Sequence, residues 1–405
     1  MQKLKLAVIS TYPFRESGIA KFTKDLISTD NIKNIFSKVH VFTAAIEPSE
    51  KLIKIDFNFC DTYQLNKLAD VINKDYQMLS IQWDDGYVWK CKSAEIGYMN
   101  LFLFLKSIKV PVLITLHHGF DKKWFYTKLF CLMRSLPNVY FISQYSNQYG
   151  YIKKILKNDS NILLIPHGYP DNLRNHHQYS NRKSNEIILT TLGFFGGWKN
   201  QLTMIRLVSS VIKSGIPIKY YVLGSDVYGK DYFRECVDVV RTNHMAKNIF
   251  VKNMWLDNAS FAKYLRRTDI YVSYNNATVI GSNPSGTMTY ALGLGKPVVC
   301  CATDFTTSKE MSNLLFVAKN DNDFINILIK LTGDKKYREN ISSKIYTGTT
   351  KWTWSKISEK YAENMKKILA NGGRGSYLDG TDNKFQIWTL YKLLSFVANM
   401  NVLWK

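Results

Sequence analysis

The chain has 405 residues, of which 46% are hydrophobic and 14% aromatic, so it can bury substantial cores and is not an intrinsically disordered protein. Lys and Arg number 54 against 32 Asp and Glu, and the net charge of +22 indicates an anionic partner or a strongly solvated surface. The basic residues are spread along the chain, without zinc-finger, RNP or basic-zipper patterns. We therefore expect no nucleic-acid partner, and a phosphorylated substrate or an anionic membrane surface instead.

The cysteines and the N-terminus predict the compartment. None of the six cysteines forms a CxxC pair, and a disulfide scaffold is implausible in a chain of this size. The N-terminal apolar run is about five residues long, too short for a signal peptide, and no window reaches the roughly 18 apolar residues of a spanning helix. We therefore expect a cytoplasmic protein, with peripheral attachment to the inner face of the membrane as the alternative. The cysteines are Cys60, Cys91, Cys131, Cys236, Cys300 and Cys301.

Strand-like apolar runs alternate with helix-length segments along the whole chain, which is typical of parallel α/β sheets. A polar stretch at 171–186 has the composition of a linker between two such series. The sequence therefore predicts two Rossmann-like, doubly wound domains facing across a cleft, at 1–175 and 185–365, followed by a helical tail at 366–405. The predicted strands are 4–11, 38–44, 78–83, 110–118, 139–143 and 161–168, then 187–195, 219–225, 248–254, 269–275, 296–301 and 314–318.

Polar residues follow the predicted strands of the first half, where doubly wound sheets bind their ligands. Ser17 and Gly18 form a turn before a helix, and Gly18 allows a ligand to approach the backbone unless it is a plain turn glycine. Asp84 follows the third strand and is either an acceptor contact or a helix cap. His117 ends the fourth strand, where we expect it to contact a ligand; a purely structural histidine is the alternative.

The second half repeats this arrangement. Gly193 follows its first strand and Gly224 ends the next one. Lys199 is placed to meet the charge of a phosphate, the alternative being an ordinary exposed lysine.

The segment PSGTMTYALGLGKPVVC, at 284–300, predicts a helix that opens on Ser285, Gly286 and Thr287 and gives way to a strand at 297–299. The first amides of a helix have no internal partner and lie at the positive end of its dipole, so they can bind a diphosphate without a metal. An ordinary helix and strand of an α/β core is the alternative.

Nine segments follow one another along nearly the whole chain: YPFRESGIAKFTKDL, SIQWDDG, PVLITLHHGF, FISQYS, LLIPHGYPD, LGFFGGWKN, YYVLGS, DIYVSYN and SGTMTYALGLGKPVV. In these segments and in their order the chain resembles a family 4 glycosyltransferase of the GT-B fold, in a subgroup similar to mannosyltransferases. The resemblance implies that the second domain holds a nucleotide diphosphate sugar, with GDP-mannose favoured and a UDP-sugar possible, and that no cofactor is needed. It further implies a saccharide or lipid-linked acceptor, and a helix at 351–369 that crosses back to the first domain.

The chain departs from the broader family at three positions. Two glutamates that the family carries eight residues apart are replaced by Ser282 and Tyr290, and the arginine expected after Gly193 is Phe194. Ser282 and Tyr290 therefore stand at donor-binding positions without carboxylates. The diphosphate charge is left to Lys199 and the helix amides.

The resemblance implies a retaining transfer, which the residues can support. Negative charge develops on the departing diphosphate, and fixed cations and amides aimed at it lower the barrier. A leaving phosphate oxygen can deprotonate the incoming hydroxyl, so no protein base is required. His117, Lys199 and Asp84 are the predicted catalytic residues. No metal is expected, because the Asp-Asn-Asp at 321–323 precedes a helical run and is typical of a helix cap.

The sequence leaves three sets of alternatives. The aromatic tail at 383–405 either lies in a membrane interface or packs as a final helix on the first domain. The missing glutamates also fit a catalytically silent protein that binds nucleotide sugars. A GT-B-like epimerase or phosphorylase would share the fold.

Overall fold

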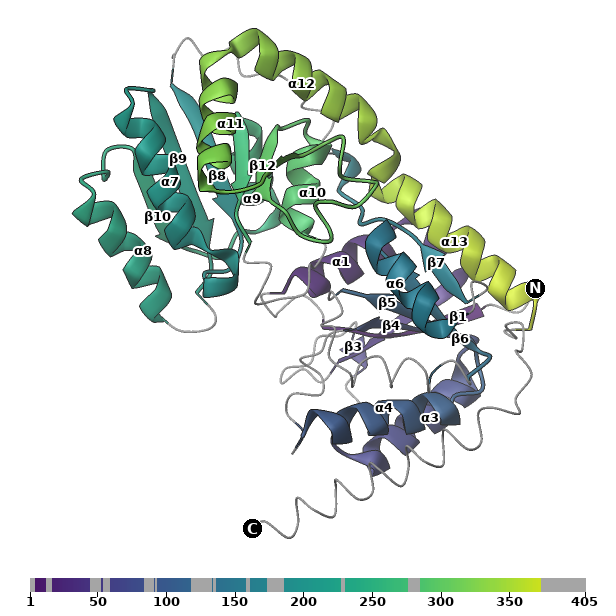
Figure 1. The fold of residues 1–405 in the computed structure, drawn as a ribbon. Coiled ribbons are helices and arrows are strands. Elements are labelled where there is room, and N and C mark those ends of the chain that lie inside the picture. Colours follow the sequence, from purple (N-terminus) through teal and green to yellow (C-terminus); the bar gives the residue numbers. More distant parts are fainter. Residues whose placement is uncertain are drawn as a thin grey trace, which may run out of the picture. The chain divides into compact units, whose positions relative to one another are not determined.

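The chain divides into two compact units, each built around one parallel β-sheet (Figure 1). The first unit comprises 1–144, 148–165 and 358–405, and the second comprises 145–147 and 166–357. The computed structural model describes residues 4–11, 17–43, 52–53, 59–83, 91, 93–117, 133, 136–157, 161–172, 186–226, 230–275 and 285–372.

The first sheet has the strand order β3-β2-β1-β4-β5-β6-β7 among the described residues, and all its pairings are parallel. Every residue of β4, β5 and β6 is buried, as expected where helices cover both faces of a parallel sheet. Its strands are β1 (Leu4–Ile9), β2 (Phe36–Phe42), β3 (Leu52–Ile53), β4 (Met78–Trp83), β5 (Val112–Leu116), β6 (Val139–Ser143) and β7 (Ile162–Leu164).

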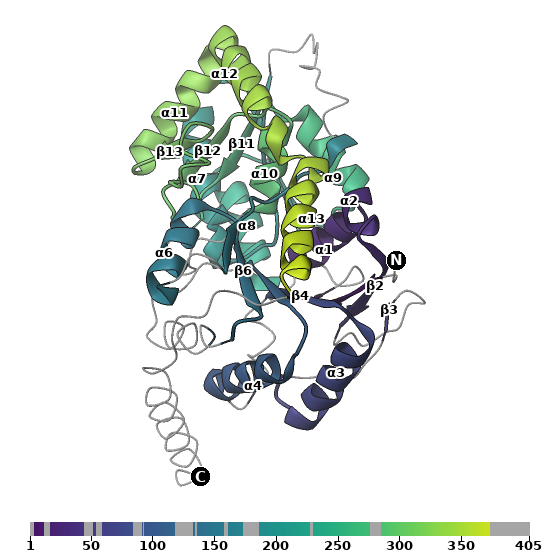
Figure 2. The same cartoon turned by 90° about the vertical axis from the view of Figure 1, so that its right-hand side faces the viewer.

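Helices α3 (Thr62–Asp75) and α4 (Ala94–Ser107) cover one face of this sheet, while α1 (Gly18–Ile27) and α13 (Trp354–Ala370) cover the other (Figure 2). Apolar residues of α3 and α4 form one hydrophobic core with the strands. The unit also contains α2 (Asp30–Lys33), and most of α6 (Ser146–Leu156) belongs to it.

The second sheet has the order β10-β9-β8-β11-β12-β13 in the described part of the chain, again with parallel pairings throughout. Helices α7, α8 and α11 supply apolar side chains to a single core with these strands. The strands are β8 (Ile187–Leu192), β9 (Ile218–Gly224), β10 (Ile249–Asn253), β11 (Ile270–Ser273), β12 (Val298–Cys301) and β13 (Phe316–Ala318). The helices are α7 (Gln201–Lys213), α8 (Lys230–Thr242), α9 (Asn258–Arg267), α10 (Gly286–Gly293), α11 (Asp321–Gly333) and α12 (Lys335–Gly348), with short 3₁₀ turns η3 (Gly197–Lys199) and η4 (Thr350–Trp352).

Both sheets follow the doubly wound order 3-2-1-4-5-6, the first with one additional strand, β7. The strand order therefore reverses between β1 and β4 in the first unit and between β8 and β11 in the second. Ligands of such sheets bind at these reversal points, outside the carboxyl ends of the strands. This confirms the predicted architecture of two doubly wound parallel sheets.

Helix α13 passes from the second unit to the first at Ser358. Beyond that residue, the Tyr361 hydroxyl lies 3.3 Å from Thr115 Oγ1 on β5, and Asn31 Nδ2 donates to Ser358 Oγ at 3.0 Å. A helix was predicted here at 351–369, crossing back to the first domain.

One disulfide corrects the expectation drawn from the cysteine count. Cys60, which precedes α3, is bonded to Cys91, which precedes α4, at a sequence separation of 31. Helices α3 and α4 pack against each other, and this brings together two cysteines that form no sequence motif. Because two cysteines are bonded, the cysteines no longer support the expectation of a reducing cytoplasm. Three free cysteines remain among the described residues: Cys236, Cys300 and Cys301.

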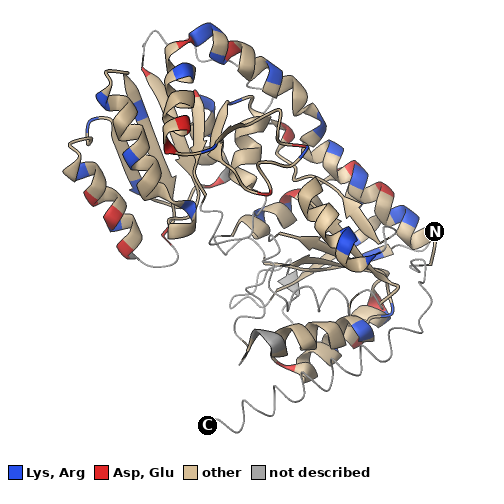
Figure 3. Ribbon diagram, viewed as in Figure 1, with Lys and Arg blue, Asp and Glu red and all other residues tan. Residues whose placement is uncertain are grey.

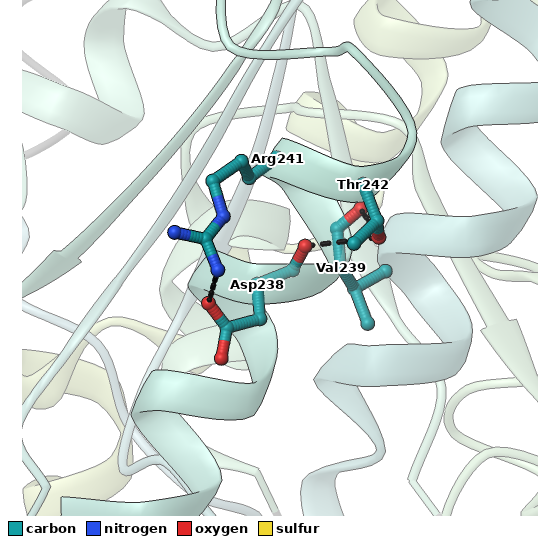
Figure 4. A network of polar contacts seen from close by, with 4 residues as sticks. All are labelled: Asp238, Val239, Arg241 and Thr242. Carbon is teal, nitrogen blue, oxygen red and sulfur yellow. Dashed lines mark hydrogen bonds and ion pairs between the residues drawn. The ribbon is translucent and has the colours of Figure 1, made fainter.

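Basic side chains are distributed over helices of both units, interspersed with acidic ones (Figure 3). An example is the last turn of α8, where Arg241 Nη2 donates to Asp238 Oδ1 at 2.9 Å and Thr242 Oγ1 donates to the Asp238 carbonyl at 2.9 Å (Figure 4). Exposed pairs of this kind contribute about 0.2–1 kcal/mol, so they decide little about the fold. No helix in the described ranges has the length and hydropathy of a membrane span.

Candidate functional site

Two glycines shape the backbone at the reversal point of the second sheet. Gly193, directly after β8, has φ +135°, a conformation that other L-residues rarely adopt. Its amide donates to the Leu223 carbonyl at 3.1 Å, which extends the β8 and β9 pairing past the end of β8. Gly224, at the end of β9, has no room for a side chain, because a Cβ there would overlap the Gly193 carbonyl. The positive φ therefore favours glycine at 193, and close backbone packing requires it at 224.

Lys199 ends the η3 turn that follows Gly193 and is partly buried. Its Cε lies 4.0 Å from the position that a Gly193 Cβ would take. Within the part of the chain that the structure describes, no acceptor or carboxylate pairs with its Nζ. Burial alone lowers the pKa of Lys199 from 10.5 to about 8. An ammonium group withdrawn from water in this way calls for an anion beside it.

The lowered pKa of Lys199 gives a pH dependence of stability with a defined sign. Between about pH 8 and pH 10.5 the unfolded chain binds the proton of this lysine while the folded chain releases it. Stability rises with pH wherever the unfolded state binds more protons, so the free energy of unfolding should rise relative to a Lys199→Met variant across this window. Urea denaturation of both proteins at several pH values measures the difference. A constant difference would contradict the burial of this ammonium group.

The predicted helix with free N-terminal amides is present as α10. Ser285 is its N-cap, with Oγ accepting the Met288 amide at 3.4 Å, and it is 6% exposed. The amides of Gly286 and Thr287 have no hydrogen-bond acceptor among the described residues and lie at a partly exposed helix start. These two N–H groups and the helix dipole make the start of α10 suited to an anion.

Tyr271 on β11 connects this helix start to the end of β8. Its hydroxyl lies 2.8 Å from Thr287 Oγ1 and 3.1 Å from the Leu192 carbonyl oxygen. Burial raises the pKa of Tyr271 to about 12, which keeps the hydroxyl protonated and able to donate. Gly193 follows Leu192 directly and Lys199 lies beside Gly193, so the lysine and the α10 amides flank the same strand end.

Two of the three positions at which the sequence departs from the pattern it resembles, Tyr290 and Phe194, pack against other aromatic rings. Tyr290 is 4% exposed, and its ring contacts those of Phe261, with centroids 5.5 Å apart, and His167, at 6.2 Å. Phe194 stacks on Trp255, with centroids 6.0 Å apart and the planes 21° from parallel. Trp255 is 45% exposed, so the pair presents an aromatic surface at the carboxyl edge of this sheet.

His167 was not among the predicted site residues, yet it lies at the start of α10. A Cβ on Gly286 would be 3.2 Å from His167 Nε2. His167 Nδ1 lies 2.6 Å from the Gly168 carbonyl and donates to it, and Trp354 packs on the ring with centroids 5.8 Å apart. A signal existed in the sequence, because His167 stands in LLIPHGYPD, one of the segments that carried the resemblance.

In the first unit His117 is held by two buried glutamines. Its Nε2 lies 2.9 Å from Gln82 Oε1 and its Nδ1 lies 3.1 Å from Gln144 Nε2, so Nε2 carries the proton and Nδ1 accepts. Phe22 contacts the ring edge-on, with centroids 4.6 Å apart. Gln144 Oε1 is buried without a hydrogen-bond partner in the described residues. His117 is thus fixed at the carboxyl end of β5, with both ring nitrogens engaged by protein.

Ser17 and Gly18 lie where the sequence places them, at the turn into α1. Ser17 is the N-cap, and its Oγ accepts the Ala20 amide at 3.4 Å and lies 3.2 Å from Thr11 Oγ1. Open space surrounds the position of a Gly18 Cβ, so packing does not require glycine there.

The remaining predicted residues divide into two groups. Asp84 and Ser282 lie outside the described residues. The Asp-Asn-Asp at 321–323 was predicted to be the cap of a helix, but it forms the first turn of α11; the N-cap is Asn320, whose side chain accepts the Asp323 amide at 2.9 Å. Asp323 in turn accepts the Lys319 amide at 2.9 Å. No group of three potential metal ligands occurs within the described ranges.

No family model and no curated protein matches this sequence. Solved structures do match it. A glycosyltransferase from Rickettsia africae ESF-5 superposes with a TM-score of 0.71 at 12% identity, over 92% of this chain and 100% of the other. Anabaena HepE in complex with UDP-glucose gives 0.68 at 12% identity, over 90% and 100%. Sucrose-phosphate synthase from Thermosynechococcus elongatus gives 0.64 at 13% identity, over 91% and 100%.

At these low identities the similarity establishes the fold. The chain has the GT-B fold of two doubly wound sheets that the resemblance implied. The Rickettsia protein is a glycosyltransferase, and the HepE structure holds UDP-glucose.

Proposed function

We propose that this protein is a retaining glycosyltransferase that transfers a hexose from a nucleotide diphosphate sugar to a saccharide or lipid-linked acceptor. One observation carries the proposal: a partly buried Lys199, without a counter-ion among the described residues, flanks the same strand end as the unbonded amides of Gly286 and Thr287. A diphosphate supplies the negative charge that both features lack. The glycosyltransferases with the same fold support this function.

The donor is bound by the second unit, with its diphosphate between Lys199 and the start of α10. Gly193 and Gly224 keep the backbone close enough to hold this arrangement, and Ser285 shapes the first turn of the helix. The HepE structure with UDP-glucose makes a UDP-sugar the first donor to test. GDP-mannose, which the sequence resemblance favours, is the second.

The same groups promote bond cleavage. As the anomeric bond breaks, negative charge grows on the leaving diphosphate, and the Lys199 ammonium and the two fixed amides stabilise it without having to reorganise. A phosphate oxygen then takes the proton of the incoming hydroxyl on the same face of the sugar, which gives retention. In this proposal His117, held by Gln82 and Gln144, contacts the sugar or the acceptor, and no metal takes part.

The first unit is proposed to bind the acceptor. The net charge of +22 favours an acceptor attached to an anionic surface, such as a lipid-linked saccharide at a membrane. Binding to vesicles with and without anionic lipid tests this attachment.

Thermal unfolding with UDP-glucose, GDP-mannose, UDP, GDP and UDP-N-acetylglucosamine, with and without metal, tests the donor site. A ligand at 100 times its dissociation constant stabilises the native state by about 2.7 kcal/mol, so we expect a selective rise in melting temperature with one base. Slow release of free sugar from that donor would separate an enzyme from a silent binder. No stabilisation by any of the five compounds would contradict the proposed function.

A further inference from the structure

A histidine that the proposed transfer does not use lies at the start of α10. His167 is 9% exposed, and its Nε2 is 3.2 Å from where a Cβ of Gly286 would lie. Gly286 is the first residue of α10, and its amide is one of the two that lack an acceptor in the described residues. An anion bound by this amide would therefore lie within reach of Nε2.

The orientation of the ring is fixed by its own chain segment. Nδ1 carries a proton, because it lies 2.6 Å from the Gly168 carbonyl, which can only accept. In the neutral ring Nε2 is then an acceptor, and it becomes a donor when the ring takes up a second proton. Tyr290 on α10 and Trp354 on α13 pack against the ring and hold it in place.

The second proton, at Nε2, is coupled electrostatically to a bound anion. The positive end of the helix dipole disfavours an imidazolium beside it, whereas an anion on the amides favours one. Imidazole is the side chain whose charge changes most readily near neutral pH. The side chains that the structure describes as packing against the ring are Tyr290, from α10, and Trp354, from α13.

We propose that His167 binds the diphosphate of the donor beside the α10 amides and takes up a proton as it does so. This inference rests on the proposed function, because it concerns the same donor site. It gives that site a third group, drawn from the segment that precedes the second domain's first strand. The departing diphosphate would then meet a protonated imidazole as well as the Lys199 ammonium.

Isothermal titration with UDP-glucose and with GDP-mannose near pH 7, in two buffers of different ionisation enthalpy, counts the protons taken up on binding. The phosphates of a nucleotide sugar are diesters without the second ionisation of a phosphate monoester, so uptake must come from the protein. Lys199, with a pKa of about 8, is already mostly protonated at this pH. We therefore expect the wild-type protein to take up a measurable fraction of a proton.

Two variants assign that proton. His167→Asn keeps a donor for the Gly168 carbonyl and removes Nε2, so the proton uptake should fall to the small share that Lys199 supplies, and the affinity for the nucleotide sugar should fall at least tenfold. His167→Gln keeps a polar group near Nε2 that cannot ionise, so it should also reduce the uptake to that share but lose less affinity. His244→Asn is the matched control: His244 is exposed in the same unit, and its φ of +56° suits asparagine. It should bind and take up protons as the wild type does.

The outcomes separate this inference from the proposed function. Tight binding without proton uptake, or uptake that stays at the wild-type level in His167→Asn, would overturn the role of His167 and leave the donor site intact. Failure of the wild-type protein to bind either nucleotide sugar would overturn both.

Discussion

Replacing Lys199 by methionine is expected to lower turnover more than tenfold and to weaken nucleotide-sugar binding. The substitution keeps most of the volume of the side chain and removes its charge. A charge contact with the leaving diphosphate in a water-poor site is worth at least about 1.4 kcal/mol, which corresponds to a factor of ten in rate. Initial rates of sugar transfer or of donor hydrolysis, measured over a range of donor concentrations, separate the effect on kcat from that on KM.

The stability of the same variant distinguishes a functional charge from a structural one. Below about pH 8 the ammonium group of Lys199 is charged, and its removal from water costs desolvation energy. The free energy of unfolding of Lys199→Met should therefore be no lower than that of the wild type. Lys213→Met, at the exposed end of α7, is the matched control and should leave turnover unchanged. Wild-type turnover in Lys199→Met would remove the lysine from the proposed site.

Gly224→Ala is expected to lower the free energy of unfolding by about 3 kcal/mol, at the upper end of the costs of overpacking. The added Cβ would overlap the Gly193 carbonyl oxygen and lie 2.6 Å from its carbon. These are backbone atoms, held by the bond from the Gly193 amide to the Leu223 carbonyl, so relief requires the end of β8 to move. Because Lys199 lies beside Gly193, donor affinity should fall together with stability.

Urea denaturation and nucleotide-sugar titration measure the two effects of Gly224→Ala. Gly333→Ala is a control in the same unit, since a Cβ at Gly333, the last residue of α11, meets nothing within 4 Å. It should change stability by no more than about 1 kcal/mol, the range of helix propensities. A Gly224→Ala protein as stable as this control would show that the two strand ends can separate at little cost.

The core strands were predictable from sequence because each is a short apolar run bounded by polar residues. All twelve predicted runs overlap a strand, and the boundaries of β4 and β6 agree with the prediction to the residue. The strand that was missed, β3 (Leu52–Ile53), has two residues at the edge of the first sheet. So short a segment carries no periodicity, and its pairing with β2 is decided by the tertiary structure.

The residues of the candidate site also divide into those that local sequence predicts and those that only tertiary contacts place. Ser285 and the amides after it were predictable, because N-cap chemistry and a helix start are local features of the sequence. The contact of His167 with Gly286 joins residues 119 positions apart, and the bond of Cys60 to Cys91 joins the starts of two helices. Neither pair lies in a local pattern, so sequence reasoning placed His167 in a motif without a role and expected no disulfide.

The sequence by itself determined the alternation of strands and helices, the two doubly wound sheets, and the helix start that can bind an anion. Those features depend on hydrophobic periodicity and on capping, which act between residues a few positions apart. Only the tertiary structure decided that Lys199 is withdrawn from water, that Gly224 must lack a side chain, and that His167 meets the α10 amides. Burial and contact between distant segments exist only once the strands are in order, because packing brings those segments together.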